Sequence, residues 1–130
     1  MGLIMKKLAY LLILGATLSS TAWAACKPPD SLRKFPDGKT ATIDQMKNAQ
    51  KVFTEFDQKI EKYRACLKEE YDAQLKKYPK ADEDLKKQFF EDRQKKDDAA
   101  YLQVLQAKED LNLQIRVYKE TAAAKKAAAN

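Results

Sequence analysis

Histidine is absent from the whole chain, and glycine occurs only three times in 130 residues. Without histidine the chain lacks the usual general base and the commonest metal ligand. Two of the glycines, Gly2 and Gly15, lie within the first 24 residues, so there is no glycine-rich phosphate-binding loop. So few glycines, together with 34% charged residues, also argue against a β-rich fold. We therefore expect a protein that is not an enzyme and needs no cofactor or metal.

Carboxylates are plentiful, but their pattern does not suggest a catalytic pair. Acidic pairs occur at Glu69-Glu70, Glu91-Asp92 and Asp97-Asp98, in stretches that are rich in lysine. On a helix, such residues are typical of ion pairs with lysines four positions away. We interpret them as surface ion pairs and expect no small-molecule substrate.

Cysteine is scarce too, since the chain has only Cys26 and Cys66. The two are 40 positions apart and match neither a zinc pattern nor a Cys-x-x-Cys redox motif. We therefore expect a structural disulfide between them, formed in an oxidising compartment. The sequence leaves open whether this bond lies within one chain or joins two chains.

The chain has one long apolar run, from Leu8 to Leu18. It is about half as long as the roughly 20 residues that a membrane-spanning helix needs. The run follows the basic pair Lys6-Lys7 and precedes Ala22-Trp23-Ala24, a spacing typical of a signal-peptidase site. We predict a cleavable signal peptide over residues 1–24, which would be the chain's only contact with a membrane. The mature protein would be periplasmic, with secretion as the alternative.

Two alternatives for this N-terminus are disfavoured, and one choice stays open. An uncleaved membrane anchor is disfavoured by the short apolar run. A lipoprotein modified at Cys26 is disfavoured because Trp23 stands where a lipobox has leucine. The sequence does not decide whether translation starts at Met1 or at Met5.

The charge balance of the mature chain is only mildly basic. Removal of Lys6 and Lys7 with the signal peptide leaves 23 basic against 19 acidic residues, a net charge of about +4. So small a surplus, spread among many acids, is typical of a solvated surface of mixed charge. We expect no nucleic-acid partner.

The mature chain begins with an irregular arm over residues 25–41. Pro28-Pro29 favours extended backbone, and Pro36-Asp37-Gly38 predicts a turn. Thr42, followed three residues later by Gln45, forms a capping box that predicts the start of a helix.

Helical periodicity dominates the rest of the sequence. Apolar residues recur every three or four positions from Ile43 to Tyr78, with the heptad character of a coiled coil, until Pro79 ends the pattern. A second helix is expected from near Lys80. The fold class is therefore all-α: an antiparallel hairpin over residues 42–122, with its turn near residues 78–81.

The short turn also predicts which residues of the two helices face each other. Their numbers should add to about 158, which places Phe56 opposite Leu102. Beyond the hairpin, the Ala/Lys-rich tail of residues 123–130 has no large apolar group, and we expect it to fray.

We expect the arm to cover the part of the first helix that has no apolar partner on the second helix. Tyr63 and Leu67 face a stretch of the second helix, residues 91–98, that is polar on every side. Cys66 lies in this uncovered zone, about 36 Å of helix from Thr42.

The sixteen residues from Cys26 to Thr42 can span up to roughly 53 Å, so they can reach Cys66. A Cys26–Cys66 bond would make the arm run back along the first helix and lay Leu32 and Phe35 on it as a third layer.

Four short motifs of the mature N-terminal half carry a resemblance. They are Cys26-Lys-Pro-Pro, Pro36-Asp-Gly, Gln45-Met46-x-x-Ala49-Gln50-x-Val52 and Tyr63-x-x-Cys66-Leu67. In these motifs the chain resembles small exported proteobacterial proteins of unassigned function, over roughly residues 26–70. The resemblance implies the arm and its disulfide and supplies no activity.

A second likeness is coarser. A basic, exported helical hairpin is similar to the arms of the periplasmic chaperone Skp. Skp also has a β-rich trimerisation body, for which this chain has no strand pattern.

The function that the sequence predicts is a small binding or structural module of the cell envelope. Tyr71, Leu75 and Phe90 should stay partly exposed near the turn, beyond the reach of the arm. Together with Lys76, Lys77 and Lys80, they form the predicted surface for a protein partner or for self-association. The alternative is a holdase-like chaperone that cradles unfolded envelope proteins between the helices.

Overall fold

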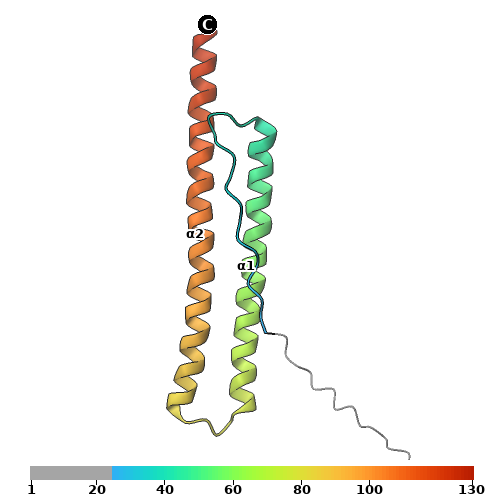
Figure 1. The fold of residues 1–130 in the computed structure, drawn as a ribbon, viewed down its shortest axis with the longest axis vertical. Coiled ribbons are helices and arrows are strands. Elements are labelled where there is room, and N and C mark those ends of the chain that lie inside the picture. The colour runs from blue at the N-terminus through green and yellow to red at the C-terminus, as the bar shows by residue number, and fades with distance from the viewer. Residues whose placement is uncertain (1–24) are drawn as a thin grey trace, which may run out of the picture.

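A computed structural model describes residues 25–130 of the chain. Residues 1–24, which include the expected signal peptide, lie outside the described residues. The described part is all-α: helix α1 (Ile43–Lys77) and helix α2 (Glu83–Ala128) pack against each other as an antiparallel hairpin (Figure 1). Neither described helix is long and apolar enough to cross a membrane. The predicted fold class is confirmed.

Local sequence signals explain the ends of α1. Thr42 is its N-cap, and the predicted capping box with Gln45 is present in both directions, with hydrogen bonds of 2.8 and 3.2 Å. At the other end α1 stops at Lys77, because Pro79 cannot continue a helix and restricts the backbone of Tyr78.

The start of α2 differs from the prediction, and this changes the pairing of the helices. The side chain of Asp82 accepts a hydrogen bond from the Leu85 amide and caps the helix, so α2 begins at Glu83 and not near Lys80. The register is shifted by about three residues, because Arg64 pairs with Asp97 and Tyr71 with Phe90, whose numbers add to 161 and not to about 158. The predicted pairing of Phe56 with Leu102 is therefore wrong, and Leu102 is 54% exposed.

The C-terminal end of α2 extends further than expected. The helix continues to Ala128 and projects beyond the N-terminal end of α1 (Figure 1). Alanine has the highest helix propensity, and Lys125 and Lys126 lie in the last turn, where the helix dipole favours cations. Residues 122–130 are all exposed, and their predicted fraying stays a prediction.

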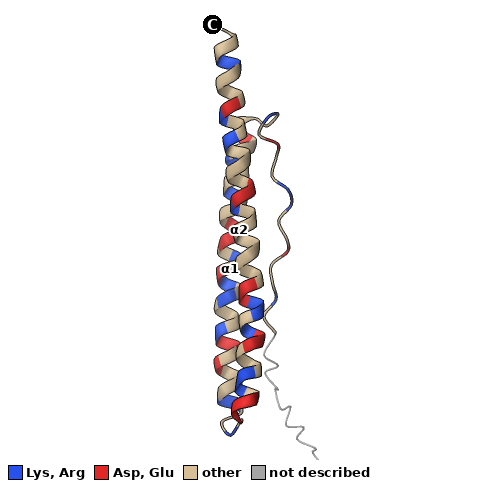
Figure 2. Ribbon diagram, turned by 90° about the vertical axis from the view of Figure 1, so that its left-hand side faces the viewer, with Lys and Arg blue, Asp and Glu red and all other residues tan. Residues whose placement is uncertain are grey.

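The core is a narrow stripe between the helices that the arm completes. Leu32 of the arm packs against it, as the sequence predicted, and so does Cys26. Phe35, the other residue predicted for this layer, is half-buried but does not pack on the central buried cluster. Figure 2 shows the arm as a third element beside the two helices, which themselves carry interspersed basic and acidic residues. The central buried residues are Phe56, Ile60, Tyr63, Leu67 and Ala100.

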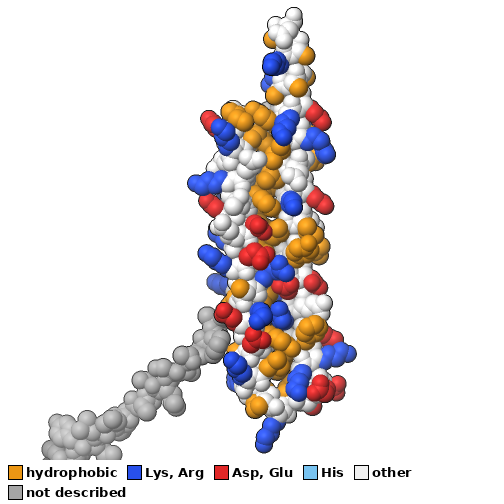
Figure 3. Space-filling view, turned by 180° about the vertical axis from the view of Figure 1, so that it is seen from behind, with side chains coloured by type: hydrophobic (Ala, Val, Ile, Leu, Met, Phe, Trp, Pro, Cys, Tyr) orange, Lys and Arg blue, Asp and Glu red, His pale blue; other side chains and the backbone are white. Residues whose placement is uncertain are grey.

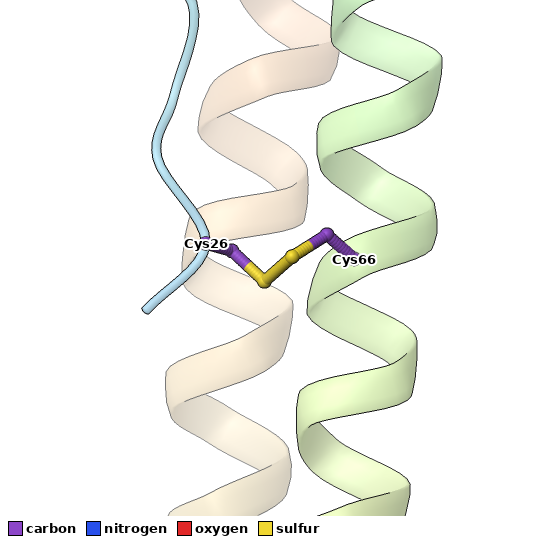
Figure 4. Close-up of a disulfide and its surroundings, with 2 residues drawn as sticks. All are labelled: Cys26 and Cys66. Carbon is purple, nitrogen blue, oxygen red and sulfur yellow. A yellow bond between two sulfur atoms is a disulfide. The ribbon is translucent and has the colours of Figure 1, made fainter. Parts of the chain in front are cut away.

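A disulfide joins Cys26 of the arm to Cys66 of α1 within the same chain (Figure 4). Tyr63 and Leu67, which the sequence left uncovered, are 9% and 3% exposed beside this bond. The disulfide therefore holds the arm where α2 offers mainly polar side chains.

Candidate functional site

The first candidate site is the tip, defined here as residues 71–90 at the closed end of the hairpin. Tyr71 of α1 and Phe90 of α2 meet edge to face, with ring centroids 6.3 Å apart. Phe90 remains 47% exposed, while Tyr71 and Leu75 are half-buried. The expectation that these three stay partly exposed is confirmed. The register brings Tyr71 and Phe90 together, and Leu75 lies one helical turn further along α1.

A second aromatic pair extends this surface towards the turn. The rings of Tyr78 and Phe89 have centroids 5.9 Å apart, and Tyr78 is 44% exposed. Cations lie over two of the rings: the Lys77 ammonium is 5.3 Å from the Tyr78 centroid, and the Arg93 guanidinium is 5.4 Å from that of Tyr71. The tip thus combines aromatic surface with positive charge.

The lysines of the tip fall into two groups. Lys86 pairs with Glu83 and Lys87 with Glu91, both on α2. Lys76, Lys77 and Lys80 are exposed and form no ion pair within residues 25–130. These three are the cations that remain available to a partner, and of them only Lys77 contacts the aromatic surface.

The tip is a surface and not a pocket. A cavity of about 10 Å³ lies between Tyr71, Phe89 and Arg93, which is room for at most one water molecule. Within residues 25–130 no group of three potential metal ligands occurs. The tip offers exposed aromatic rings and lysines, which suit an apolar and acidic surface.

Other apolar side chains are exposed away from the tip. On the face opposite the arm, hydrophobic side chains form separate groups with charged side chains between them (Figure 3). Along the described hairpin the exposed large apolar residues outside the tip are Ile43 50%, Val52 36%, Tyr101 49%, Leu102 54% and Leu113 43%.

An ion pair joins the two helices at mid-length. The Arg64 guanidinium donates from Nε to Oδ1 of Asp97 at 2.8 Å and from a terminal nitrogen to Oδ2 at 3.1 Å. This fork-to-fork bond lowers the pKa of Asp97 and raises that of Arg64. Arg64 also lies 5.5 Å from the ring centroid of Tyr101.

Two of the predicted surface ion pairs are present on α2. Glu91 pairs with Lys87, and Asp92 with Lys96, each four residues apart. The hydrogen bond from Lys96 to Asp92 raises the pKa of the Lys96 ammonium. Asp97 departs from this pattern, because its partner lies on the other helix.

The second candidate site is an open groove between the arm and α1, with a volume of about 910 Å³. The arm residues 27–36 line one side, and α1 residues between Gln45 and Lys59 line the other side, here called the floor. A smaller groove of about 370 Å³ lies between residues 31–35 of the arm and α2. Phe56 contributes to both.

The far end of the arm is held against α2 by Gly38. Its amide donates a 2.9 Å hydrogen bond to the side-chain carbonyl of Gln114, and Gly38 is buried. A Cβ atom at this position would overlap the carbonyl oxygen of Gln114 and the amide of Tyr118. The arm is thus fastened at both ends, by Cys26 and by Gly38.

Comparison with protein-family models, curated proteins and solved structures finds no match for this chain.

Sequence reasoning missed the groove and the Gly38 contact. The turn signal around Gly38 was visible, but its closeness to α2 depends on where the arm docks. The Arg64–Asp97 pair was missed because the predicted register was three residues off. Pairing each basic residue of one helix with nearby acidic residues of the other, over several possible registers, could have found this ion pair.

Proposed function

We propose that this chain is a non-catalytic module of the bacterial cell envelope, exported to the periplasm, that binds a protein partner or a second copy of itself through the tip. The observation that carries the proposal is the half-exposed Phe90, which meets Tyr71 edge to face at a tip that also carries three lysines without an ion pair among residues 25–130. Exposed aromatic groups at the centre of a patch contribute most of the affinity of protein interfaces. The proposed location rests on the signal-like N-terminus.

The test compares tip variants with a variant at an exposed apolar residue elsewhere on the hairpin. Phe90→Ala, Tyr71→Ala and Leu75→Ala should weaken capture of the partner from a periplasmic extract, or self-association in sedimentation, by at least about tenfold. Leu102→Ala is the control, because Leu102 is exposed on α2 outside the tip. The proposal fails if the protein stays monomeric at high concentration and captures nothing that the tip variants lose.

Charge reversal separates the role of the lysines from that of the aromatic rings. Replacing Lys76, Lys77 and Lys80 by glutamate should mainly slow association and reduce its dependence on salt. Equal effects on association and dissociation rates would contradict this division of roles.

A holdase-like chaperone is the second candidate. The observation that favours it is the series of exposed apolar side chains along the whole hairpin. A holdase should suppress aggregation of several unrelated unfolded proteins, and Leu102→Ala and Tyr101→Ala should impair it as much as Phe90→Ala does. A module that binds one specific partner should not suppress the aggregation of these unfolded proteins.

A further inference from the structure

We infer that the groove between the arm and α1 binds a short, extended peptide segment that is apolar along one edge and acidic in net charge. This site is separate from the tip and does not depend on the function proposed for it. Four features of the described residues lead to the inference: the length of the groove, its apolar floor, the unpaired backbone of the arm and the charge of the rim.

The groove is elongated and matches an extended chain. The α1 residues that line it run from Gln45 to Lys59 at helical spacing, a length of about 21 Å at 1.5 Å per residue. An extended chain advances about 3.3 Å per residue, so roughly six residues fit.

Apolar side chains line both the floor and the arm side of the groove. Phe56 is buried in the core, and Val52 beside it is 36% exposed. Leu32 and Phe35 of the arm are half-buried on the opposite side. These groups suit the side chains on one edge of an extended peptide, which recur at every second residue.

The backbone of the arm gives the strongest indication. No backbone amide of residues 25–36 donates a hydrogen bond to another residue of the described part, and the first bonds in the arm are those of Gly38, Lys39, Thr40 and Ala41. Prolines at 28, 29 and 36 lack the N–H group, so they bound a window of six residues, 30–35, that can pair. An exposed extended segment with unpaired N–H and C=O groups is a template for strand addition.

The rim favours an acidic peptide. Four basic side chains line the groove against the two acidic side chains of Asp30 and Glu55, an excess of two positive charges. The basic residues are Lys27, Arg33, Lys34 and Lys59. An acyl chain would fill the apolar floor but could not bond to the amides, so we favour a peptide over a lipid.

The experiment measures fluorescence anisotropy of a labelled probe with the disulfide-bonded mature protein. The probe is the hexapeptide acetyl-Asp-Val-Glu-Val-Asp-Val-amide. Three comparison peptides isolate its features: one N-methylated at alternate amides, one with lysine in place of each acid, and one with serine in place of each valine. We expect each change to weaken binding at least tenfold.

Protein variants locate the site. Val52→Asp places a carboxylate in the floor at a partly exposed helical position, and it should weaken binding of the hexapeptide at least tenfold. Leu102→Asp is the matched control and should leave binding unchanged, as should Phe90→Ala at the tip. Circular dichroism checks that each variant keeps its helices.

Three results would overturn the inference. Equal binding of the N-methylated peptide would show that the arm's amides do not pair with it. Loss of binding in Phe90→Ala but not in Val52→Asp would place the peptide at the tip. Binding of decanoate, lost in Val52→Asp, without binding of the hexapeptide would make the groove an acyl-chain site.

Discussion

At the scale of single residues, Gly38 and the Arg64–Asp97 pair determine how the parts of this molecule meet. Gly38 has no positive φ, so its backbone conformation is open to any residue. What excludes a larger residue is the nearby backbone of Gln114 and Tyr118, which cannot move aside as a flexible side chain would. The sequence could predict a turn at Gly38. It could not predict the contact between Gly38 and α2, because that contact depends on where the arm docks.

We predict that Gly38→Ala destabilises the protein by about 1–3 kcal/mol, because the added methyl group pushes the turn away from α2. The hydrogen bond from Gly38 to Gln114 would be lost with it. Thermal unfolding followed by circular dichroism measures the effect. Lys39→Ala, at an exposed neighbour, is the control and should change stability little; equal stability of the two variants would contradict the close contact.

The Arg64–Asp97 pair predicts a specific pH dependence. The pKa of Asp97 is lowered in the folded protein, so the pair stabilises the fold at pH values above the ordinary carboxyl pKa near 4. This contribution is lost as pH falls through the lowered pKa. Because both side chains are partly exposed, we expect about 1 kcal/mol at neutral pH.

Urea unfolding of the wild type and of Asp97→Asn between pH 2 and pH 8 measures this contribution. The difference in unfolding free energy should be constant above about pH 5 and shrink below about pH 4. Asp98→Asn is the control, because Asp98 is exposed and forms no ion pair within residues 25–130. A difference that grows on acidification would contradict the assignment.

At the scale of elements, the helices were predictable and their register was not. The Thr42 capping box and Pro79 set the ends of α1 through local chemistry, so the sequence sufficed. The start of α2 depended on which of several acidic residues became the N-cap. Asp82 is the N-cap, so α2 begins at Glu83, later than the predicted start near Lys80. The predicted register was therefore wrong by three residues, and Leu102, which was expected in the core, lies at the surface.

The arm is the element whose stability depends most on a covalent bond. The Cys26–Cys66 disulfide closes a loop of about 41 residues, and the chain-entropy estimate gives about 4 kcal/mol of stabilisation. For a hairpin with one narrow core stripe, this is a large share of the net stability.

We predict that the double variant Cys26→Ser, Cys66→Ser unfolds at least about 15 °C below the wild type. Limited trypsin digestion should also cut the arm at Arg33 or Lys34 much faster in the variant, because the arm would leave the hairpin. The wild type treated with dithiothreitol should behave like the variant. Unchanged melting and unchanged cleavage would show that the arm stays docked without the bond.

At the scale of the whole molecule, the arm covers one face of the hairpin and leaves the tip and the opposite face open. The sequence predicted the open tip from the reach of the arm, and the exposure of Phe90 confirms this part. The sequence could not predict the groove, because the groove depends on the distance between the docked arm and α1.

The most direct test of the central claim is site-specific photo-crosslinking in living cells. Benzoylphenylalanine would replace Phe90 at the tip in one strain and Tyr101 in another, two positions that are 47% and 49% exposed. We predict that the Phe90 position gives one discrete crosslinked product in the periplasmic fraction, while the Tyr101 position gives none. No product from Phe90, or the same products from both positions, would contradict binding of a specific partner through the tip.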